Sequence, residues 1–319
     1  MKKSTAFKND IYNFLVGFFM GGANVIPGVS GGTMLFIMGA LGKLIDALKS
    51  IAALETLKML CRLDFKGLYN RIQWRFLIGL VLGILVSFAT LAKLFVWLLE
   101  KHQMYTFAFF FGLIVASVIT VNRQMKKWSV PAVISALIST AAAYTVISLV
   151  PTDTGSSWYA MVLCGMICVI AMILPGLSGS FLMLIFGQYD RVWSAVGNVA
   201  HFKFIPAELI MIALLSLGAV IGLGMFVHVL NYLMKNFYNC TVAALIGFMI
   251  GSVPRIWPFQ SAAKTVTNAK GEEVVTQVAY HLPTWNMQLL YVLLAALAGL
   301  VLVLLIEFFA SKKQTATED

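Results

Sequence analysis

Two proline- and glycine-rich segments, residues 27–33 (PGVSGGT) and 175–181 (PGLSGSF), interrupt apolar stretches of the chain. Proline ends an incoming helix and glycine permits an irregular backbone, so each segment predicts a break followed by a new helix. The first N–H groups of a helix lack intrahelical partners and carry the positive end of the helix dipole. Together with neighbouring hydroxyl groups, they predict an anion-binding site at each break.

The candidate binding residues at the breaks are small or polar. They are Asn24, Gly28, Ser30, Gly31, Gly32, Thr33, Gly176, Ser178, Gly179 and Ser180. The first break is the more polar, because Asn24 and Thr33 align with Met172 and Phe181, so the site is expected to be asymmetric.

Close helix packing is the alternative explanation for glycine and serine in apolar segments. It is favoured for three pairs of glycines spaced four residues apart: Gly17/Gly21, Gly79/Gly83 and Gly218/Gly222. Binding is favoured for the two breaks, because Pro-Gly-x-Ser-Gly occurs at matched places in both.

The breaks belong to an internal repeat. A shift of 148 residues places residues 17–48 over residues 165–196, and a shift of 135 residues continues the match with Gly83 on Gly218. Each half then contains one hairpin, which returns the chain to its starting side, and three crossings. Because this number is odd, the halves are expected to have opposite orientations, as in the inverted repeats of secondary transporters.

Ionisable residues within apolar segments are candidates for a transport pathway. The 135-residue shift places Lys93 over His228, and both are predicted to line the pathway; alternatively, Lys93 extends to an interface and His228 makes a packed hydrogen bond. Lys43 and Arg191 also superpose, just beyond each hairpin. They could guide an anion inward from opposite faces or anchor the helices at the interface.

The composition predicts an all-α polytopic membrane protein. Of the 319 residues, 60% are hydrophobic and 11% are charged, and the apolar residues form runs long enough for transmembrane helices. The expected apolar segments are 11–26, 30–49, 76–99, 104–121, 130–150, 158–174, 178–199, 207–234, 238–257 and 287–309. The net charge of +10 is concentrated in a few loops, which indicates topology signals and no nucleic-acid partner.

The loop charges predict cytoplasmic N- and C-termini. The first repeat is expected within residues 1–150 and the second within 158–309, with an external loop at 255–286 and a cytoplasmic tail at 310–319. Each hairpin, 11–49 and 158–199, is either re-entrant or two full crossings. Residues 51–75 mix basic and apolar side chains, so they either lie on anionic headgroups or form an ordinary topology-setting loop.

Motifs of covalent catalysis and metal binding are missing from the sequence. It has no Walker loop, HExxH or GxSxG, and its four cysteines lack metal-ligand spacing, which favours a role in helix packing. No metal or cofactor is therefore expected. Coupling to a proton or sodium gradient, with His228 as a proton carrier, and assembly as a homo-oligomer stay open.

The motifs GANVIPGVSGGTMLFIMGAL and ILPGLSGSFLMLIFGQYDRV resemble those of the bacterial polyprenyl-phosphate transporter family, and the resemblance extends over residues 10–310. It implies an inner-membrane translocase that returns undecaprenyl phosphate from the outer to the cytoplasmic leaflet for reuse in peptidoglycan and other envelope polymers. It also implies that residues 24–33 and 175–180 hold the headgroup.

The leading hypothesis is therefore a lipid-phosphate flippase that works by alternating exposure of a headgroup site at the membrane midplane, with lipid as partner. One alternative is a small-anion channel or exchanger, since paired helix N-termini suit inorganic anions equally well. Another is a membrane-embedded phosphatase or transferase, against which the lack of a nucleophile and acid–base cluster argues.

Overall fold

A computed structural model describes residues 2–24, 31–149, 154–155, 157–267 and 273–318. The first half contains α1 (Lys2–Asn24), α2 (Gly31–Ile37), α3 (Leu41–Ala52), α4 (Leu54–Cys61), α5 (Phe65–Arg71), α6 (Trp74–Lys101), α7 (Gln103–Arg123) and α8 (Val130–Ser148). The second contains α9 (Trp158–Ile173), α10 (Gly179–Ile185), α11 (Tyr189–Ala200), α12 (Pro206–Asn236), α13 (Tyr238–Ser252), the 3₁₀ turn η1 (Val253–Ile256), β1 (Gln260–Thr267), β2 (Glu273–Tyr280) and α14 (Met287–Glu318).

Six helices in the described part of the chain are long and apolar enough to cross a bilayer. Their apolar stretches are Trp74–Leu91, Gln103–Arg123, Val130–Ser148, Pro206–Asn236, Tyr238–Ile256 and Met287–Phe308, and α9 is a shorter apolar helix. Many of their apolar side chains are exposed, as expected for contact with lipid. The prediction of a largely helical, multi-pass membrane protein is thereby confirmed.

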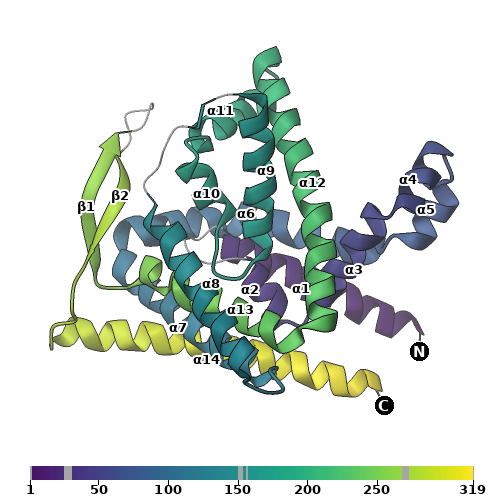
Figure 1. Cartoon of the computed structure of the whole chain (residues 1–319). Helices are drawn as coiled ribbons and strands as arrows, with labels where there is room; N and C mark the ends of the chain where they lie inside the picture. The colour runs from purple at the N-terminus through teal and green to yellow at the C-terminus, as the bar shows by residue number, and fades with distance from the viewer. Residues whose placement is uncertain (1, 25–30, 150–153, 156, 268–272, 319) are drawn as a thin grey trace.

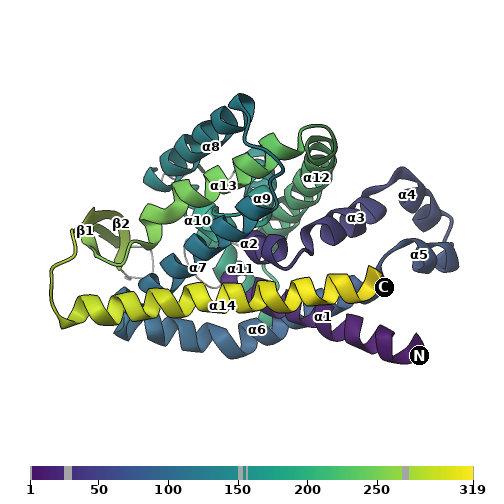
Figure 2. The same ribbon diagram turned by 90° about the horizontal axis from the view of Figure 1, so that it is seen from below.

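The long helices pack in pairs, two of which join the two halves of the chain. Within each half, α1 lies along α6 and α9 along α12; across the halves, α7 lies along α14 and α8 along α13. Figure 1 shows α9 beside α12, and Figure 2 shows α14 extending across the molecule toward the side that carries both termini. The exchange of partners means that neither half holds all of its helix contacts within itself.

Glycines make the helix pairs close. A Cβ at Gly17 on α1 would lie 2.0 Å from the carbonyl oxygen of Leu80 on α6. A Cβ at Gly165 on α9 would lie 2.1 Å from that of Leu215 on α12. The packing role favoured for Gly17 is therefore confirmed, and the two repeat shifts relate the two crossings residue by residue.

Replacing Gly218 with valine is expected to destabilise the protein by about 1–3 kcal/mol or more, because a Cβ there would lie 2.0 Å from the carbonyl oxygen of Val162. Thermal unfolding in detergent measures the effect. Gly224→Val on the same helix is the control, because a Cβ at Gly224 meets nothing within 4 Å. Equal melting temperatures for the two variants would contradict a tight crossing at Gly218.

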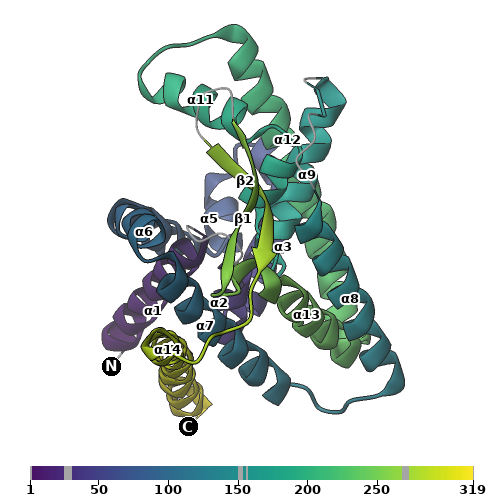
Figure 3. The same cartoon turned by 90° about the vertical axis from the view of Figure 1, so that its left-hand side faces the viewer.

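The segment expected to be an external loop contains a β-hairpin. β1 and β2 pair antiparallel, with Gln260 opposite Tyr280, and Figure 3 shows them in front of the helices. Valine and threonine recur in both strands, and they favour extended backbone. The hairpin lies far from both chain termini and from α4–α5, as Figure 1 shows.

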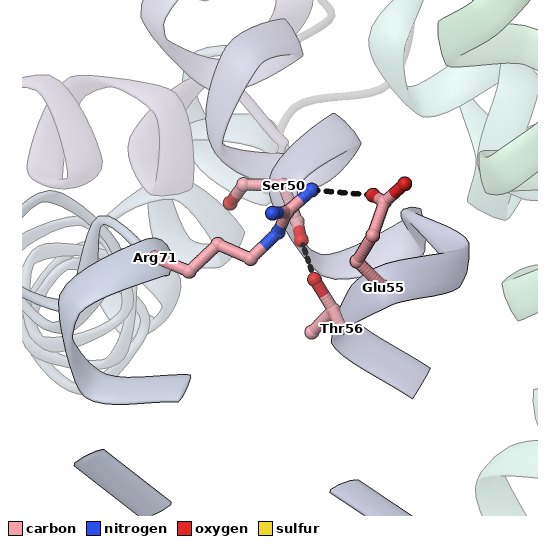
Figure 4. A network of polar contacts seen from close by, with 4 residues as sticks. All are labelled: Ser50, Glu55, Thr56 and Arg71. Atoms are coloured by element: carbon pink, nitrogen blue, oxygen red, sulfur yellow. Dashed lines mark hydrogen bonds and ion pairs between the residues drawn. The ribbon is translucent and has the colours of Figure 1, made fainter. Parts of the chain in front are cut away.

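Helices α4 and α5 form a small lobe beside α3. Arg71 on α5 forms an ion pair with Glu55 on α4 at 2.7 Å, and the Thr56 hydroxyl donates to the carbonyl oxygen of Ser50 at 2.5 Å (Figure 4). Phe65 and Tyr69 remain exposed on this lobe. The lobe is therefore held by polar contacts and also presents two large aromatic side chains on its surface.

Candidate functional site

The first break leads into α2, whose first turn is capped by Asn24. The backbone N–H of Gly31 donates to Oδ1 of Asn24 at 2.8 Å, across the break from the end of α1. A Cβ at Gly31 would lie 2.6 Å from Cγ of Met20, so α2 begins directly against the preceding helix. Asn24 therefore occupies one of the N–H donors that the sequence assigned to an anion.

At the second break, α10 likewise begins against the preceding helix, but the polar groups there are serine hydroxyls. A Cβ at Gly179 would lie 2.6 Å from the carbonyl oxygen of Cys168 on α9, and the chain reverses at Gly176, whose φ of +87° suits glycine. The hydroxyl oxygens of Ser178 and Ser180 are 2.8 Å apart, and either can donate. Ser178 is half-buried and Ser180 is exposed, so this pair can reach a ligand from the surface.

The two breaks are close to each other. A Cβ at Gly32, in the first turn of α2, would lie 1.9 Å from the carbonyl oxygen of Ile173, the last residue of α9. Only glycine permits this approach, because any side chain would collide with backbone. The structure thus brings Asn24, Gly31 and Gly32 next to the helix end that leads into the second break.

Some predicted residues lie outside what the structure describes. Gly28 and Ser30 are outside the described residues, and so are the side chains of Thr33 on α2 and Lys93 on α6. Their assignment to the site stays a prediction.

The outlying ionisable residues have separate environments. His228 is exposed on α12, and its Nδ1 lies 2.7 Å from the carbonyl oxygen of Gly224 in the same helix. Arg191 is exposed on α11. The ammonium of Lys43 lies 5.1 Å from the ring centroid of Tyr12. Lys43 therefore contacts α1, whereas His228 is bonded to its own helix.

Lys43 lines a polar cavity of about 580 Å³ at the junction of α1, α3 and α6. Asn13, Tyr69 and Arg75 also line it, and Arg75 is paired with Asp10 at 2.5 Å. Residues of α1 and α5 are among those that line the cavity, and Figure 2 shows these two helices on the side of the molecule that carries both termini. It provides space for a polar group beside Lys43.

Arg255 is the residue near the second break that the sequence did not single out. It is the first residue of the segment 255–286, which the sequence predicts to be an external loop. Its guanidinium carbon lies 4.6 Å from the ring centroid of Phe181, which directly follows Ser180 on α10. The sequence signal is a lone arginine inside the apolar run SVPRIWPF, but its contact with α10 depends on tertiary structure.

The described residues form no cluster of metal ligands, and two of the cysteines are buried on one helix. No group of three His, Cys, Asp or Glu residues there could hold a metal ion. Cys164 and Cys168 are buried one turn apart on α9, with their sulfurs 3.8 Å apart. Their burial confirms the packing role predicted for this pair.

These features define a multi-pass α-helical membrane protein with two adjoining broken hairpins. Residues 20–274 match a family described as undecaprenyl phosphate translocase-like, and the chain belongs to that family. It is 35% identical over 311 residues to a polyprenyl-phosphate transporter of Vibrio cholerae serotype O1, covering 95% of this chain and 98% of that protein. A polyprenyl-phosphate transporter of Staphylococcus aureus is 28% identical over 262 residues, covering 77% of this chain and 86% of that protein. No solved structure gave a significant match.

Proposed function

We propose that this protein is a flippase that moves undecaprenyl phosphate from the outer to the cytoplasmic leaflet of a bacterial inner membrane, for reuse in peptidoglycan and other envelope polymers. The family match and the names of the two relatives support a polyprenyl phosphate as substrate. The structural observation that carries the proposal is the contact of the two breaks at Gly32 and Ile173, between pairs of long apolar helices.

The headgroup site comprises residues 24–33 and 175–180. A phosphate monoester needs several hydrogen-bond donors, and charge-assisted bonds to it are stronger than neutral ones. Ser178 and Ser180 offer two hydroxyls, and Ser30 and Thr33 add two more. We expect a phosphate oxygen to compete with Oδ1 of Asn24 for the N–H of Gly31, so that Asn24 caps α2 whenever the headgroup is elsewhere.

Alternating exposure of this site would follow from two inverted repeats. The bounds of the elements support such a repeat: α2 and α3 match α10 and α11 under the 148-residue shift. The equivalent helix contacts of Gly17 with Leu80 and of Gly165 with Leu215 also support the repeat. In this mechanism the hairpins rock against the exchanged helix pairs, and the polyprenyl tail stays in lipid.

The proposed orientation places both termini and α4–α5 in the cytoplasm and the β-hairpin outside. The position of these parts at opposite ends of the molecule supports it (Figure 1). Exposed Phe65 and Tyr69 beside Lys66 would allow α4–α5 to rest on anionic headgroups. The cavity at Lys43 would then receive the phosphate on the cytoplasmic side, and Arg191 would guide it from the outer side.

A proton or sodium gradient would drive net movement. In this scheme Lys93 balances the phosphate charge and His228 carries the proton. Because His228 is exposed on α12, its side chain would have to turn toward the transport pathway during the cycle to carry a proton.

Uptake of labelled undecaprenyl phosphate into the inner leaflet of proteoliposomes tests the proposal. We expect the Ser30→Leu/Ser178→Leu double variant to lose at least tenfold in rate, because each hydroxyl bonded to a charged group contributes roughly 1.5–3 kcal/mol. Ser148→Leu, at an exposed position on α8, is the matched control. An unchanged rate in the double variant would remove the headgroup assignment.

The second candidate function is a small-anion channel or exchanger, which the polar cavity beside Lys43 favours. The same vesicles distinguish the two functions. Chloride or phosphate flux that is unaffected by polyprenyl phosphate, with no lipid movement under pH or sodium gradients, would support the channel. Release of inorganic phosphate from the lipid would instead indicate a phosphatase.

A further inference from the structure

Arg255 places a cation beside the second hairpin at the end of α13. It lies in η1, directly after the apolar stretch of α13, and its side chain is half-buried. Its guanidinium lies over the face of Phe181 at 4.6 Å, a cation–π contact between α10 and η1. The aromatic ring covers one face of the guanidinium, while its N–H groups in the plane can still bind an anion.

No carboxylate balances Arg255 within the part of the chain that the structure describes. The ion pairs found there join Arg71 to Glu55, Arg75 to Asp10 and Arg123 to Glu307. A charge partly withdrawn from water is costly unless an opposite charge accompanies it. Arginine presents a planar fork of donors that matches the oxygens of a phosphate.

Tyr280 interacts electrostatically with Arg255, but its phenol stays neutral. Burial raises the pKa of the Tyr280 phenol, and Arg255 only partly opposes the rise. Its phenol therefore remains protonated near pH 7 and leaves the positive charge unbalanced.

An apolar cavity adjoins η1, the turn that carries Arg255. It has a volume of about 330 Å³, and Tyr144, Pro254, Trp257 and Leu282 are among its lining residues. Pro254 and Arg255 are consecutive, so one turn of chain supplies both the cavity wall and the charge. Trp257 is held in place by donation from its indole N–H to the carbonyl oxygen of His281 at 3.1 Å.

We propose that Arg255 and this cavity form an entry subsite for a lipid phosphate monoester, in which Arg255 pairs with the phosphate and the cavity receives the first isoprenoid units. The inference rests on the proposed function and adds to it. The cavity is at the small end of the range for ligand pockets, so most of a long polyprenyl chain remains in lipid. Its position beside the β-hairpin places it on the proposed outer side, where the substrate would arrive. Phe181, which Arg255 contacts, follows Ser178 and Ser180 in the second break, so the subsite adjoins the proposed headgroup site.

Binding to the full-length protein in nanodiscs tests the two parts of the subsite separately. The probes are farnesyl phosphate, farnesol and inorganic phosphate. Arg255→Gln is expected to weaken farnesyl phosphate binding roughly tenfold to a hundredfold and to leave farnesol binding unchanged. Trp257→Ala is expected to weaken both prenyl ligands by a similar factor, about tenfold.

Matched controls remove a cation or a tryptophan elsewhere. Lys203→Gln changes an exposed lysine between α11 and α12, and Trp285→Ala changes an indole that is 96% exposed. Neither is expected to alter binding. Arg255→Lys, which keeps the charge but not the planar fork, should retain more affinity than Arg255→Gln, and comparing these two folded variants separates binding from stability.

The outcomes distinguish the subsite from the wider proposal. Unchanged farnesyl phosphate affinity in Arg255→Gln, while the wild-type protein transports polyprenyl phosphate, overturns the role of Arg255 and leaves the proposed function intact. Inorganic phosphate that binds as tightly as farnesyl phosphate overturns the role of the cavity. Absence of both lipid binding and lipid movement in the wild-type protein overturns the proposed function and the subsite together.

Discussion

Leucine at position 32 is expected to reduce polyprenyl phosphate transport to the background rate of protein-free vesicles. Gly32 is the point at which the two broken hairpins meet, and a Cβ there would lie 1.9 Å from the carbonyl oxygen of Ile173. Because that neighbour is backbone, it cannot move aside as a flexible side chain could. The substitution must separate α2 from the end of α9, and a site shared by the two breaks would then be disrupted.

The control for this variant is Gly42→Leu on α3, where a Cβ meets nothing within 4 Å. Gly32→Ala forms the milder companion, and overpacking of this kind is expected to reduce stability by about 1–3 kcal/mol. Transport and thermal unfolding are measured on the same preparations. A folded Gly32→Leu protein with normal transport would show that the contact between the breaks is dispensable.

Asn24→Asp is expected to weaken binding of polyprenyl phosphate at least a hundredfold and to leave polyprenol binding unchanged. The new carboxylate would still accept the N–H of Gly31. This hydrogen bond would be stronger than the one to asparagine, because the positive end of the helix dipole stabilises a negatively charged acceptor. It would also place a negative charge where the phosphate is proposed to bind. Juxtaposed like charges in such a site cost several kcal/mol, which exceeds the value needed for a hundredfold effect.

Asn286→Asp is the matched control, since Oδ1 of Asn286 also accepts a backbone N–H, that of Leu289, at 3.0 Å. It adds the same charge at another helix start, on the exposed segment before α14. Binding isotherms for the lipid phosphate and the lipid alcohol provide the measurement. Equal losses for both ligands would indicate a distorted fold, and no loss for the phosphate would place the headgroup elsewhere.

Much of the helical architecture could be predicted from the sequence, because apolar runs and helix breakers are local signals. The expected break after residue 26 and the helix restart near residue 30 agree with α1 ending at Asn24 and α2 beginning at Gly31. The β-hairpin was missed, because its strands are short and partly polar and were hidden in a presumed loop. The pairing of α7 with α14 and of α8 with α13 was also missed, since no local pattern specifies which apolar helices become neighbours.

The candidate site was predictable in composition but only partly in geometry. The repeated motif identifies Ser178 and Ser180, whose hydroxyls prove to be 2.8 Å apart. It could not reveal that Asn24 binds the N–H of Gly31, a contact that depends on how the chain turns through the break. Arg255 was missed because its contact with Phe181 joins positions far apart in the sequence. The assignment of these residues to a headgroup remains a prediction.

The exchange of helix partners has a consequence for biogenesis. The chain enters the membrane from its N-terminus, so α7 is inserted long before α14, the helix that it packs along. Gly112 on α7 would meet the carbonyl oxygen of Ala296 on α14 at 1.8 Å if it carried a Cβ, so this surface is shaped for one late-arriving neighbour. Until α14 has been synthesised and inserted, the first half exposes this glycine surface to lipid or to an insertion chaperone, so the α7–α14 pair forms only after most of the second half has been made.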